Sequence, residues 1–357
     1  MDGNESFLEL LQISIGSRDT LSSVPSVAKW NALYEESEKQ SVLGFMLAGI
    51  ERLPKGQRPP QELLLQWIGV GQLIEQQNKH VNERCVDLAT FFADSGFRSC
   101  ILKGQGNSLM YPNPMSRQPG DIDIWIDGSK DDIVSFVHRK YPNAKVTERH
   151  AEFPLYADVE VEVHYKPSVP LSVKYDKRLN EYWESVKDEQ FLHNGSLPNG
   201  AGEICYPTIG FDIVFQIAHM MKHFFSEGLG MRHIVDYYYV LRSAHDAGLK
   251  VKEYSDVISH LGMKRFAEAV MWVLVEACGM SKEWMVCEVD EKRGRLLLDE
   301  IMAGGNFGHG NTRSAKKLMS KSATLSILMK NMKMVRLFPE EAIMAPVSNV
   351  IRKLSFK

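Results

Sequence analysis

The stretch from Leu102 to His164 constrains the fold more than any other part of the chain, because two acidic segments in it alternate as β-strands do. In the first, the D-I-D motif at residues 121–123 precedes an apolar run at residues 124–126. Side chains alternate along a strand, so Asp121 and Asp123 are predicted to share one face. Two ionised carboxylates this close repel each other, and a divalent cation between them removes that cost. The pattern therefore indicates a site for Mg²⁺ or Mn²⁺.

A second acidic strand is predicted farther along, over residues 159–165. Its alternation places one set of polar residues on a single face, namely Asp158, Glu160, Glu162 and His164. Valines occupy the positions between them and indicate a buried opposite face. If the two strands are neighbours, either Glu160 or Glu162 can complete a three-carboxylate metal site. His164 is interpreted as a core residue or as a support for the ligands, because Mg²⁺ prefers oxygen ligands.

A basic turn that contains glycine precedes the acidic strands. It reads Lys103-Gly104-Gln105-Gly106 and follows a strand predicted at residues 98–102. A short helix is predicted at residues 107–110, and its N-terminus would offer free backbone amides to a phosphate. Arg117 lies in a proline-rich loop that leads to the D-I-D motif. It is interpreted either as a phosphate ligand or as an ion-pair partner of these aspartates.

Taken in order, these motifs resemble a branch of bacterial nucleotidyltransferases within the superfamily that includes DNA polymerase β. The segments that carry the resemblance are Leu102-Lys103-Gly104, residues 111–123 and Glu162-Val163-His164. The branch continues with spaced histidines and an R-x-x-x-D motif, matched here by His219, His223, Arg232 and Asp236. An ordered set of this kind is far more specific than a single D-x-D motif.

The resemblance implies an α+β protein with a small mixed-sheet core between N-terminal and C-terminal helical regions. We place the N-terminal helical region at residues 1–95, the core at 96–205 and the C-terminal helical domain at 206–357. It implies a metal-dependent enzyme that transfers a nucleoside monophosphate from a nucleoside triphosphate to a hydroxyl of an acceptor. The catalytic and metal-binding residues would be Asp121, Asp123 and Glu162. The nucleotide-binding residues would be Lys103, Gly104, Ser108, Arg117, His219, His223 and Arg232.

The turn departs from the wider superfamily, in which a serine after the glycine contacts the nucleotide phosphate. Here Gln105 follows Gly104, so Lys103, the turn amides and Ser108 are the expected substitutes. A non-catalytic protein that binds nucleotide or acts as a regulatory interaction module is therefore an alternative. The missing serine favours it, and the presence of all three carboxylates opposes it. A metal-dependent phosphohydrolase is a third hypothesis, supported only by two histidines.

Those histidines, His219 and His223, are four residues apart and share one face of a predicted helix. Arg232 and Asp236 have the same spacing and are expected to form a local ion pair. Two interpretations stay open for this group. His219, His223 and Arg232 either line a cleft that faces the carboxylates and contact nucleotide or acceptor, or belong to a buried polar network between two helices.

Helical patterns flank the core. Helices are predicted from residue 7, at 27–53, 60–95, 208–226, 254–261, 265–278 and 291–302, and residues 171–206 are predicted to be a loop or hairpin. The N-terminal helices are interpreted as a scaffold for the sheet. Residues 313–336 form a basic amphipathic pattern, interpreted as a solvated helix face, with an anionic acceptor, RNA or a membrane surface as the alternative ligands.

Composition narrows the class of protein and of partner. The net charge is −3 and charged residues make up 24% of the 357 residues, which is ordinary for a soluble globular protein. This balance favours a small molecule or a protein as acceptor over a long nucleic acid. The five cysteines form no C-x-x-C motif and are predicted to be reduced. A cytoplasmic protein without a signal peptide or transmembrane segment is expected.

Overall fold

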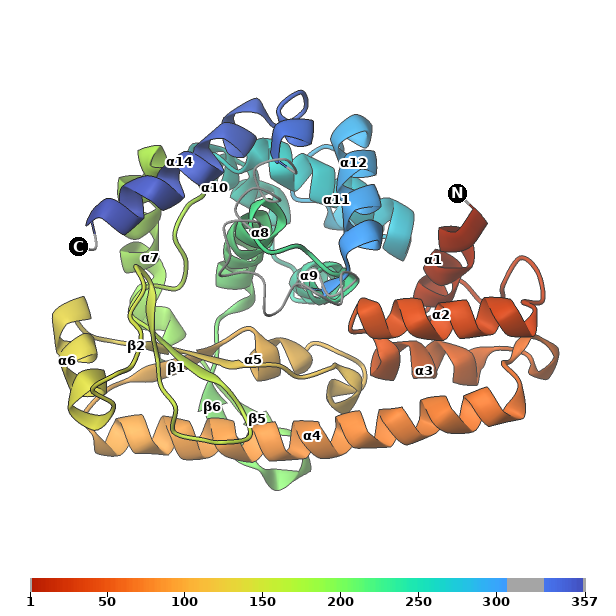
Figure 1. Cartoon of the computed structure of the whole chain (residues 1–357), viewed down its shortest axis with the longest axis horizontal. Helices are drawn as coiled ribbons and strands as arrows, with labels where there is room; N and C mark the ends of the chain where they lie inside the picture. The colour runs from red at the N-terminus through yellow and green to blue at the C-terminus, as the bar shows by residue number, and fades with distance from the viewer. Residues whose placement is uncertain (1, 307–330, 356–357) are drawn as a thin grey trace.

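The computed structural model describes residues 2–306 and 331–355 (Figure 1). A small mixed sheet lies between helices that precede it in the chain and helices that follow it. This arrangement confirms the predicted α+β class with flanking helical regions. Among the described helices, none combines the length and the apolar character needed to cross a membrane.

The main sheet has four strands in the order β1-β2-β4-β3. Their bounds are Ser99–Leu102 for β1, Ile122–Ile126 for β2, His150–Glu152 for β3 and Val161–His164 for β4. Strand β2 is antiparallel to β1 and parallel to β4, and β3 is antiparallel to β4. The predicted strand over residues 159–165 is therefore shorter than expected. Asp158 and Glu160 precede β4 instead of lying within it.

Helix α4, Gln61–Asp94, runs along one side of the molecule and joins the N-terminal helices to the sheet (Figure 1). Its buried residues recur three, four or seven positions apart, as expected for an amphipathic helix. At one end the ring of Trp67 packs against that of Trp30, with the centroids 6.3 Å apart. At the other end Phe92 packs against Phe153, at 5.5 Å. One helix therefore connects two hydrophobic clusters.

Among the described residues, three α-helices precede α4, namely α1 (Asp2–Ile15), α2 (Val27–Lys39) and α3 (Leu43–Arg52). The prediction of one continuous helix over residues 27–53 was wrong, because the chain turns between Lys39 and Leu43. Ser41 adopts a φ of 56° there, in the left-handed region that ends helices. Serine is not a strong signal for this conformation, so the sequence pattern did not reveal the break.

Residues 171–206 contain more regular structure than predicted. Helix α7, Asp176–Gln190, occupies most of the first half, and the strands β5 (Asn194–Leu197) and β6 (Gly202–Cys205) form the hairpin. The helix buries only Leu179, Trp183 and Gln190. With so few apolar positions among charged residues, its period is hard to recognise in the sequence. The hairpin itself agrees with the prediction.

The helices after the hairpin pack above the sheet in the view of Figure 1. They are α8 (Ile209–Phe225), α9 (Met231–Asp246), α10 (Tyr254–His260), α11 (Lys264–Cys278), α12 (Glu291–Gly304) and α14 (Pro339–Ser355). Helices α5 (Gly104–Ser108) and α6 (Lys130–Lys140) lie within the sheet region of the chain. Most of the predicted basic helix at residues 313–336 falls on residues 307–330, outside the described residues.

Candidate functional site

The three candidate carboxylates lie together at the start of two neighbouring parallel strands. Asp123 in β2 is directly opposite Glu162 in β4, and Asp121 immediately precedes β2. A carboxylate oxygen from each of the three lies within 4.8 Å of the others. Partner residues in adjacent strands point to the same face, which brings these acidic side chains to one point. Glu160, the other candidate considered for the third position, is outside this group.

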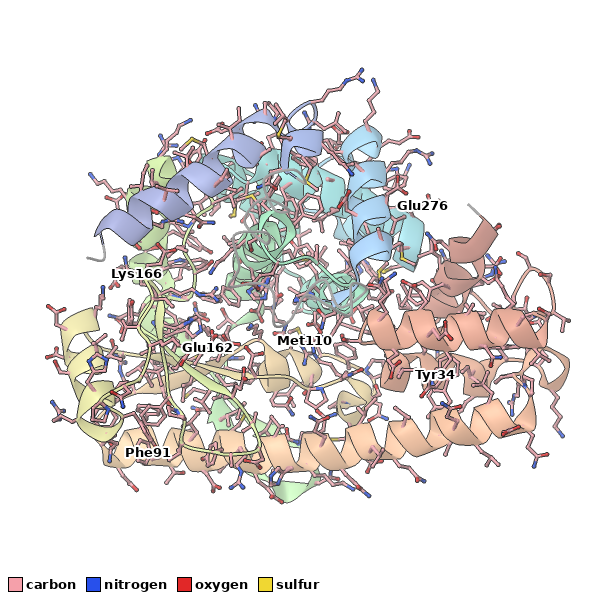
Figure 2. The ribbon with its side chains drawn as sticks, viewed as in Figure 1. Tyr34, Phe91, Met110, Glu162, Lys166 and Glu276 are labelled. Atoms are coloured by element: carbon pink, nitrogen blue, oxygen red, sulfur yellow. The ribbon has the colours of Figure 1, made fainter. Side chains whose placement is uncertain are left out.

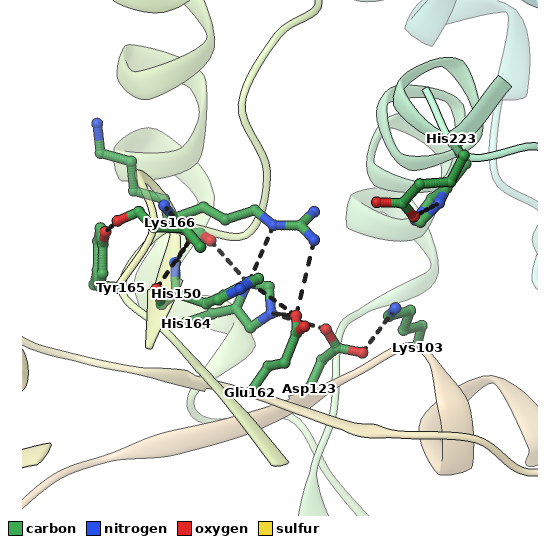
Figure 3. A network of polar contacts seen from close by, with 11 residues as sticks. Lys103, Asp123, His150, Glu162, His164, Tyr165, Lys166 and His223 are labelled. Atoms are coloured by element: carbon green, nitrogen blue, oxygen red, sulfur yellow. Dashed lines mark hydrogen bonds and ion pairs between the residues drawn. The ribbon is translucent and has the colours of Figure 1, made fainter. Parts of the chain in front are cut away.

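Cationic side chains surround these carboxylates (Figure 3). Lys103 Nζ lies 2.7 Å from Asp123 Oδ2, and His164 Nε2 lies 2.8 Å from Asp123 Oδ1. Asp123 is only 2% exposed. Burial alone would raise the pKa of Asp123, but the charge of Lys103 and the hydrogen bond from His164 outweigh it and lower this pKa to about 2. Asp123 is therefore ionised at neutral pH.

Glu162 has an equally polar environment. Its Oε2 lies 2.8 Å from His150 Nδ1, 3.4 Å from His164 Nε2 and 3.8 Å from Arg149 Nη2. Burial would raise the pKa of Glu162, and its contacts with His150 and His164 lower it well below the ordinary value. Figure 2 labels Glu162 near the middle of the view, below the C-terminal helices.

Lys103 reaches the carboxylates from the turn between β1 and α5. Its φ is 46°, a left-handed conformation that is uncommon for a residue with a side chain, and Gly104 follows at 50°. Such strained residues cluster at functional sites, where the surrounding structure holds them in place. Burial would lower the pKa of Lys103, but Asp121 and Asp123 outweigh it and raise this pKa. Lys103 therefore carries a positive charge beside the carboxylates.

A cavity of about 1070 Å³ opens beside this cluster. Strands and turns of the sheet contribute Lys103, Asp121, Arg149, His150, Glu160 and Glu162 to its lining. Helix α8 and the turn after it contribute Lys222, His223 and Glu227, and α2 contributes Glu35, Glu38 and Lys39. The N-terminal helices were interpreted as a scaffold only, so this share of the lining was missed. Its residues lie more than sixty positions before Lys103 and carry no motif.

Two cations in this lining were also missed, namely Arg149 and Lys222. Lys222 is half-buried on α8, and among the described residues no carboxylate oxygen lies within 4.0 Å of its ammonium group. Burial, together with the charge of Arg149, lowers the pKa of Lys222 to about 7. Its position three residues after His219 and next to His223 is the signal that could have identified it. Arg149 lies outside every predicted element, so no pattern indicated its role.

The histidines of α8 meet a third histidine from α9. The ring centroids of His219 and His223 are 4.3 Å apart, and that of His233 is 5.6 Å from His219 and 5.7 Å from His223. Burial holds the pKa of His219 and of His233 well below the ordinary value. His223 lines the large cavity, and His219 lines a small one next to Gly104. The three uncharged rings are consistent with the interpretation as a buried polar network between α8 and α9. His223 is the member of this network that lines the large cavity.

Arg117 forms a buried ion pair with a residue that the sequence pattern did not suggest. Its Nε and Nη2 each lie 2.8 Å from an oxygen of Asp236, on α9, and Tyr111 Oη donates to the same carboxylate at 2.6 Å. Arg117 and Asp236 are 5% and 3% exposed. Arg232 Nη1 donates to the carbonyl of Gln118 at 3.2 Å and lines the large cavity. The guanidinium of Arg117 is thus engaged within the protein, which argues against the predicted phosphate contact.

Ser108 was predicted as a phosphate ligand, and its position does not support this role. It is 1% exposed, and its hydroxyl donates to the carbonyl of Gln105 at 2.7 Å. It is also not part of the lining of the large cavity. The loop before the carboxylates is anchored elsewhere, by Asn78 of α4, whose amide donates to the carbonyls of Met115 and Arg117 at 2.9 and 2.8 Å.

Comparisons with known proteins bear on the identity of this site. A solved structure, of an antigenic nucleotidyltransferase-like protein from Paracoccidioides brasiliensis, matches with 15% identity and a TM-score of 0.31. The match covers 53% of this chain and 94% of that chain. A search of curated proteins finds no match. The sequence model of a family described as uncharacterised nucleotidyltransferase matches residues 26–279, which is well over half of the chain. The protein therefore belongs to this family of uncharacterised nucleotidyltransferases, as its motifs predicted.

Proposed function

We propose that the protein is a metal-dependent enzyme that transfers a nucleoside monophosphate from a nucleoside triphosphate to an acceptor hydroxyl. One observation carries the proposal. Asp121, Asp123 and Glu162 converge at a large cavity, which Asp121 and Glu162 line together with basic side chains, and Asp123 lies buried next to them. Membership of a nucleotidyltransferase family supports the type of reaction. The acceptor is proposed to be a small molecule or a protein, as the low net charge suggests.

The carboxylate oxygens fit a divalent cation. One oxygen from each of Asp121, Asp123 and Glu162 lies within 4.8 Å of the others. Carboxylate oxygens are the ligands that Mg²⁺ prefers, and a cation between them would remove the repulsion among the three charges. Asp121, Asp123 and Glu162 would hold Mg²⁺ or Mn²⁺. When bound, the cation would stabilise negative charge on the phosphoryl oxygens.

The basic residues of the cavity would bind the triphosphate. Lys103, Lys222 and Arg232 reach the lining from the β1–α5 turn, α8 and α9, which places positive charge on several sides of the cavity. Arg149 adds a fourth cation beside Glu162. Together they would offset the charge of the triphosphate, which the carboxylates would otherwise repel. Lys103 and Arg232 would bind the phosphates, as predicted from the sequence. In this proposal Lys222 and Arg149 replace Ser108 and Arg117 as phosphate ligands.

The transfer step requires a new bond between the acceptor oxygen and the α-phosphorus and loss of the bond from the α-phosphorus to the leaving oxygen. Pyrophosphate carries away the electron pair of the broken bond. Glu162, which would also hold the cation, would help to remove the proton of the acceptor hydroxyl. Lys222 has a pKa near 7 and can donate a proton to the departing pyrophosphate. The products are a nucleotidylated acceptor and pyrophosphate.

The direct test uses the purified full-length protein with Mg²⁺ and each labelled nucleoside triphosphate in turn. At least one triphosphate is expected to raise the melting temperature only when Mg²⁺ is present, because ligands that bind the folded state stabilise it. Slow release of pyrophosphate to water is expected even without the natural acceptor. Asp121→Asn should abolish both effects. The matched control is Asp158→Asn, since Asp158 pairs with Arg84 at the surface and is not part of the large cavity.

Two other outcomes would change the conclusion. If no triphosphate binds to the wild type, the proposed enzyme is excluded. Mg²⁺-dependent binding without pyrophosphate release, in the presence of a broad set of acceptors, would instead support the non-catalytic nucleotide-binding alternative.

The charge of Lys222 makes a further prediction about pH. With a pKa of about 7 in the free protein, Lys222 loses its charge as the pH rises above 7, and a neutral amine cannot neutralise phosphate. The affinity for a non-hydrolysable triphosphate is therefore expected to fall above pH 7, by up to about tenfold per pH unit. Charged groups around Lys222 include Arg149, Glu227, Glu148 and Glu162. The dissociation constant would be measured by calorimetry from about pH 6 to about pH 9.

Two variants identify Lys222 as the source of this dependence. Lys222→Arg stays charged throughout and should bind with a flatter pH profile, because the guanidinium pKa is above 12. Lys222→Met should bind weakly at every pH. If Lys222→Met keeps the wild-type profile, another group is responsible and Lys222 does not contact the triphosphate.

A further inference from the structure

Two histidines extend the carboxylate cluster on the side of strand β3. His150 of β3 is directly opposite His164 of β4, and Glu162 lies two residues before His164 on the same face. Next to Glu162, on the other side, is Asp123 of β2. Three adjacent strands thus place two imidazoles and two carboxylates on one face of the sheet. Figure 3 shows these four side chains pointing toward one another.

The distances within this group are short. His150 Nδ1 lies 2.8 Å from Glu162 Oε2, and His164 Nε2 lies 3.4 Å from the same oxygen. One ligand atom from each of His150, Glu162 and His164 lies within 4.8 Å of the others. Transition-metal ions bind imidazole nitrogen and carboxylate oxygen at about 2.0–2.2 Å, so an ion between these atoms needs only small shifts of the ligands.

His150 and Glu162 contact each other directly. Glu162 Oε2 lies 2.8 Å from His150 Nδ1, and Arg149 Nε lies 3.2 Å from the same nitrogen. The nitrogen and the oxygen are at hydrogen-bond distance, and a bound metal would take the place of the proton between them.

We propose that His150, Glu162 and His164 form a second metal site, beside the carboxylate site, that takes a divalent first-row transition metal and not Mg²⁺. Imidazole nitrogens are poor ligands for Mg²⁺ and good ones for later first-row metals such as Co²⁺ and Zn²⁺. His150 and His164 are 8% and 2% exposed, so their positions are fixed by the surrounding strands before a metal arrives. Asp123 Oδ1, 2.8 Å from His164 Nε2, is in reach as a fourth ligand.

This site goes beyond the proposed transfer reaction, because it needs no nucleotide. It shares Glu162 with the carboxylate site, whereas Asp121 belongs to the carboxylate group alone. The two sites can therefore be separated by substitution. The competing explanation is that the histidines only neutralise the carboxylates through hydrogen bonds. That explanation predicts no nitrogen ligand on any bound metal.

The test uses the metal-free full-length protein and two spectroscopic probes. Co²⁺ is titrated in while its visible absorption is followed, and Mn²⁺ is added at one equivalent for pulsed electron paramagnetic resonance, which detects directly bound nitrogen. The wild type should show both a Co²⁺ spectrum typical of nitrogen and oxygen ligands and coupling of Mn²⁺ to nitrogen. His150→Ala should bind Co²⁺ at least about tenfold more weakly and reduce the nitrogen coupling.

Further variants control for folding and for the other site. His164→Asn keeps a hydrogen-bond donor for Asp123, so it should fold like the wild type by circular dichroism and still lose nitrogen coupling. Asp121→Asn should keep the coupling. His138→Gln is the matched control, because His138 lies at the surface of α6, where its ring Nε2 is 3.2 Å from the carbonyl of Ala144.

The inference is overturned if Mn²⁺ bound to Asp121→Asn, which lacks a ligand of the carboxylate site, shows no nitrogen coupling, or if His150→Ala and His164→Asn both leave the Co²⁺ spectrum unchanged. Mg²⁺-dependent nucleotide binding is measured separately on the same preparations. Its presence without nitrogen coupling would overturn the second site and leave the proposed function intact. Nitrogen coupling without nucleotide binding would support the second metal site and contradict the proposed function.

Discussion

Asp123→Asn is expected to reduce the rate of nucleotidyl transfer by about a thousandfold or more, which corresponds to about 4 kcal/mol of lost transition-state stabilisation. Asp123 is ionised at neutral pH, since its pKa is about 2, and it lies at the centre of the cluster between Lys103 and His164. Asparagine has nearly the same shape but no charge. The measurement is the initial rate of pyrophosphate release at saturating Mg²⁺ and triphosphate.

Two comparisons make the Asp123→Asn result specific. Asp158→Asn should keep the wild-type rate within about twofold, because a surface ion pair contributes little. Circular dichroism should show that Asp123→Asn is folded, because the carboxylate of Asp121 still offsets the charge of Lys103. A variant that is folded and keeps more than about a tenth of the wild-type rate would show that Asp123 is not at the reacting centre.

The sequence predicted the centre of the site well because its signals are local. A D-x-D motif at the start of a strand places two carboxylates on one face whatever the rest of the chain does, and the alternation at 160–164 does the same for Glu162. Only the pairing of β2 with β4 had to be assumed, and it is observed. The resemblance to a nucleotidyltransferase family supplied the reaction, which residue spacing alone does not specify.

The lining of the cavity could not be predicted because it depends on the packing of distant helices. Glu35 and Glu38 of α2 line the cavity together with residues 118–120 of the loop before β2, and no local pattern encodes that arrangement. His150 lies on β3, a strand of three residues with a single apolar position, which is too short to show a period. Such elements are recognised only once their partners are in place.

Arg117 shows how a motif residue can form an ion pair with a partner that the motif does not indicate. The motif Y-P-x-P-x-x-R brought it close to the D-I-D segment, and the ion pair with an acidic residue was one of the two interpretations considered. Its partner is not Asp121 or Asp123 but Asp236, which is 119 positions away in the chain. Asp236 was expected to pair with Arg232 on the same helix. The charge of Arg232 does help to lower the pKa of Asp236, with a smaller effect than that of Arg117.

The buried pair makes the second large prediction. Arg117→Ala is expected to lower the free energy of unfolding by about 3–5 kcal/mol, because removing one partner leaves the other charge buried without compensation. Arg117 holds both oxygens of Asp236 at 2.8 Å, and the pair is nearly inaccessible to solvent. Urea unfolding, followed by circular dichroism, measures the change if the slope of the transition is the same in both proteins.

Two further variants distinguish the effect of an uncompensated buried charge from a nonspecific effect of replacing an arginine. Arg84→Ala removes an arginine that pairs with Asp158 at the surface, and it should cost less than about 1 kcal/mol. The double variant Arg117→Met with Asp236→Asn removes both charges and keeps an oxygen for the Tyr111 hydroxyl. It should be more stable than Arg117→Ala alone. If Arg117→Ala is as stable as the wild type but binds triphosphate more weakly, the phosphate interpretation of Arg117 is correct after all.

Acid provides an independent check on the same pair. Burial would raise the pKa of Asp236, but Arg117 outweighs it and lowers this pKa below the value in the unfolded chain. A lowered carboxyl pKa contributes stability above the unfolded value, near pH 4, and that contribution is lost as the pH falls through the native value. In Arg117→Ala the compensating charge is gone, so the carboxyl is more readily protonated. The difference in stability between wild type and variant should therefore be largest near neutral pH and shrink below about pH 4.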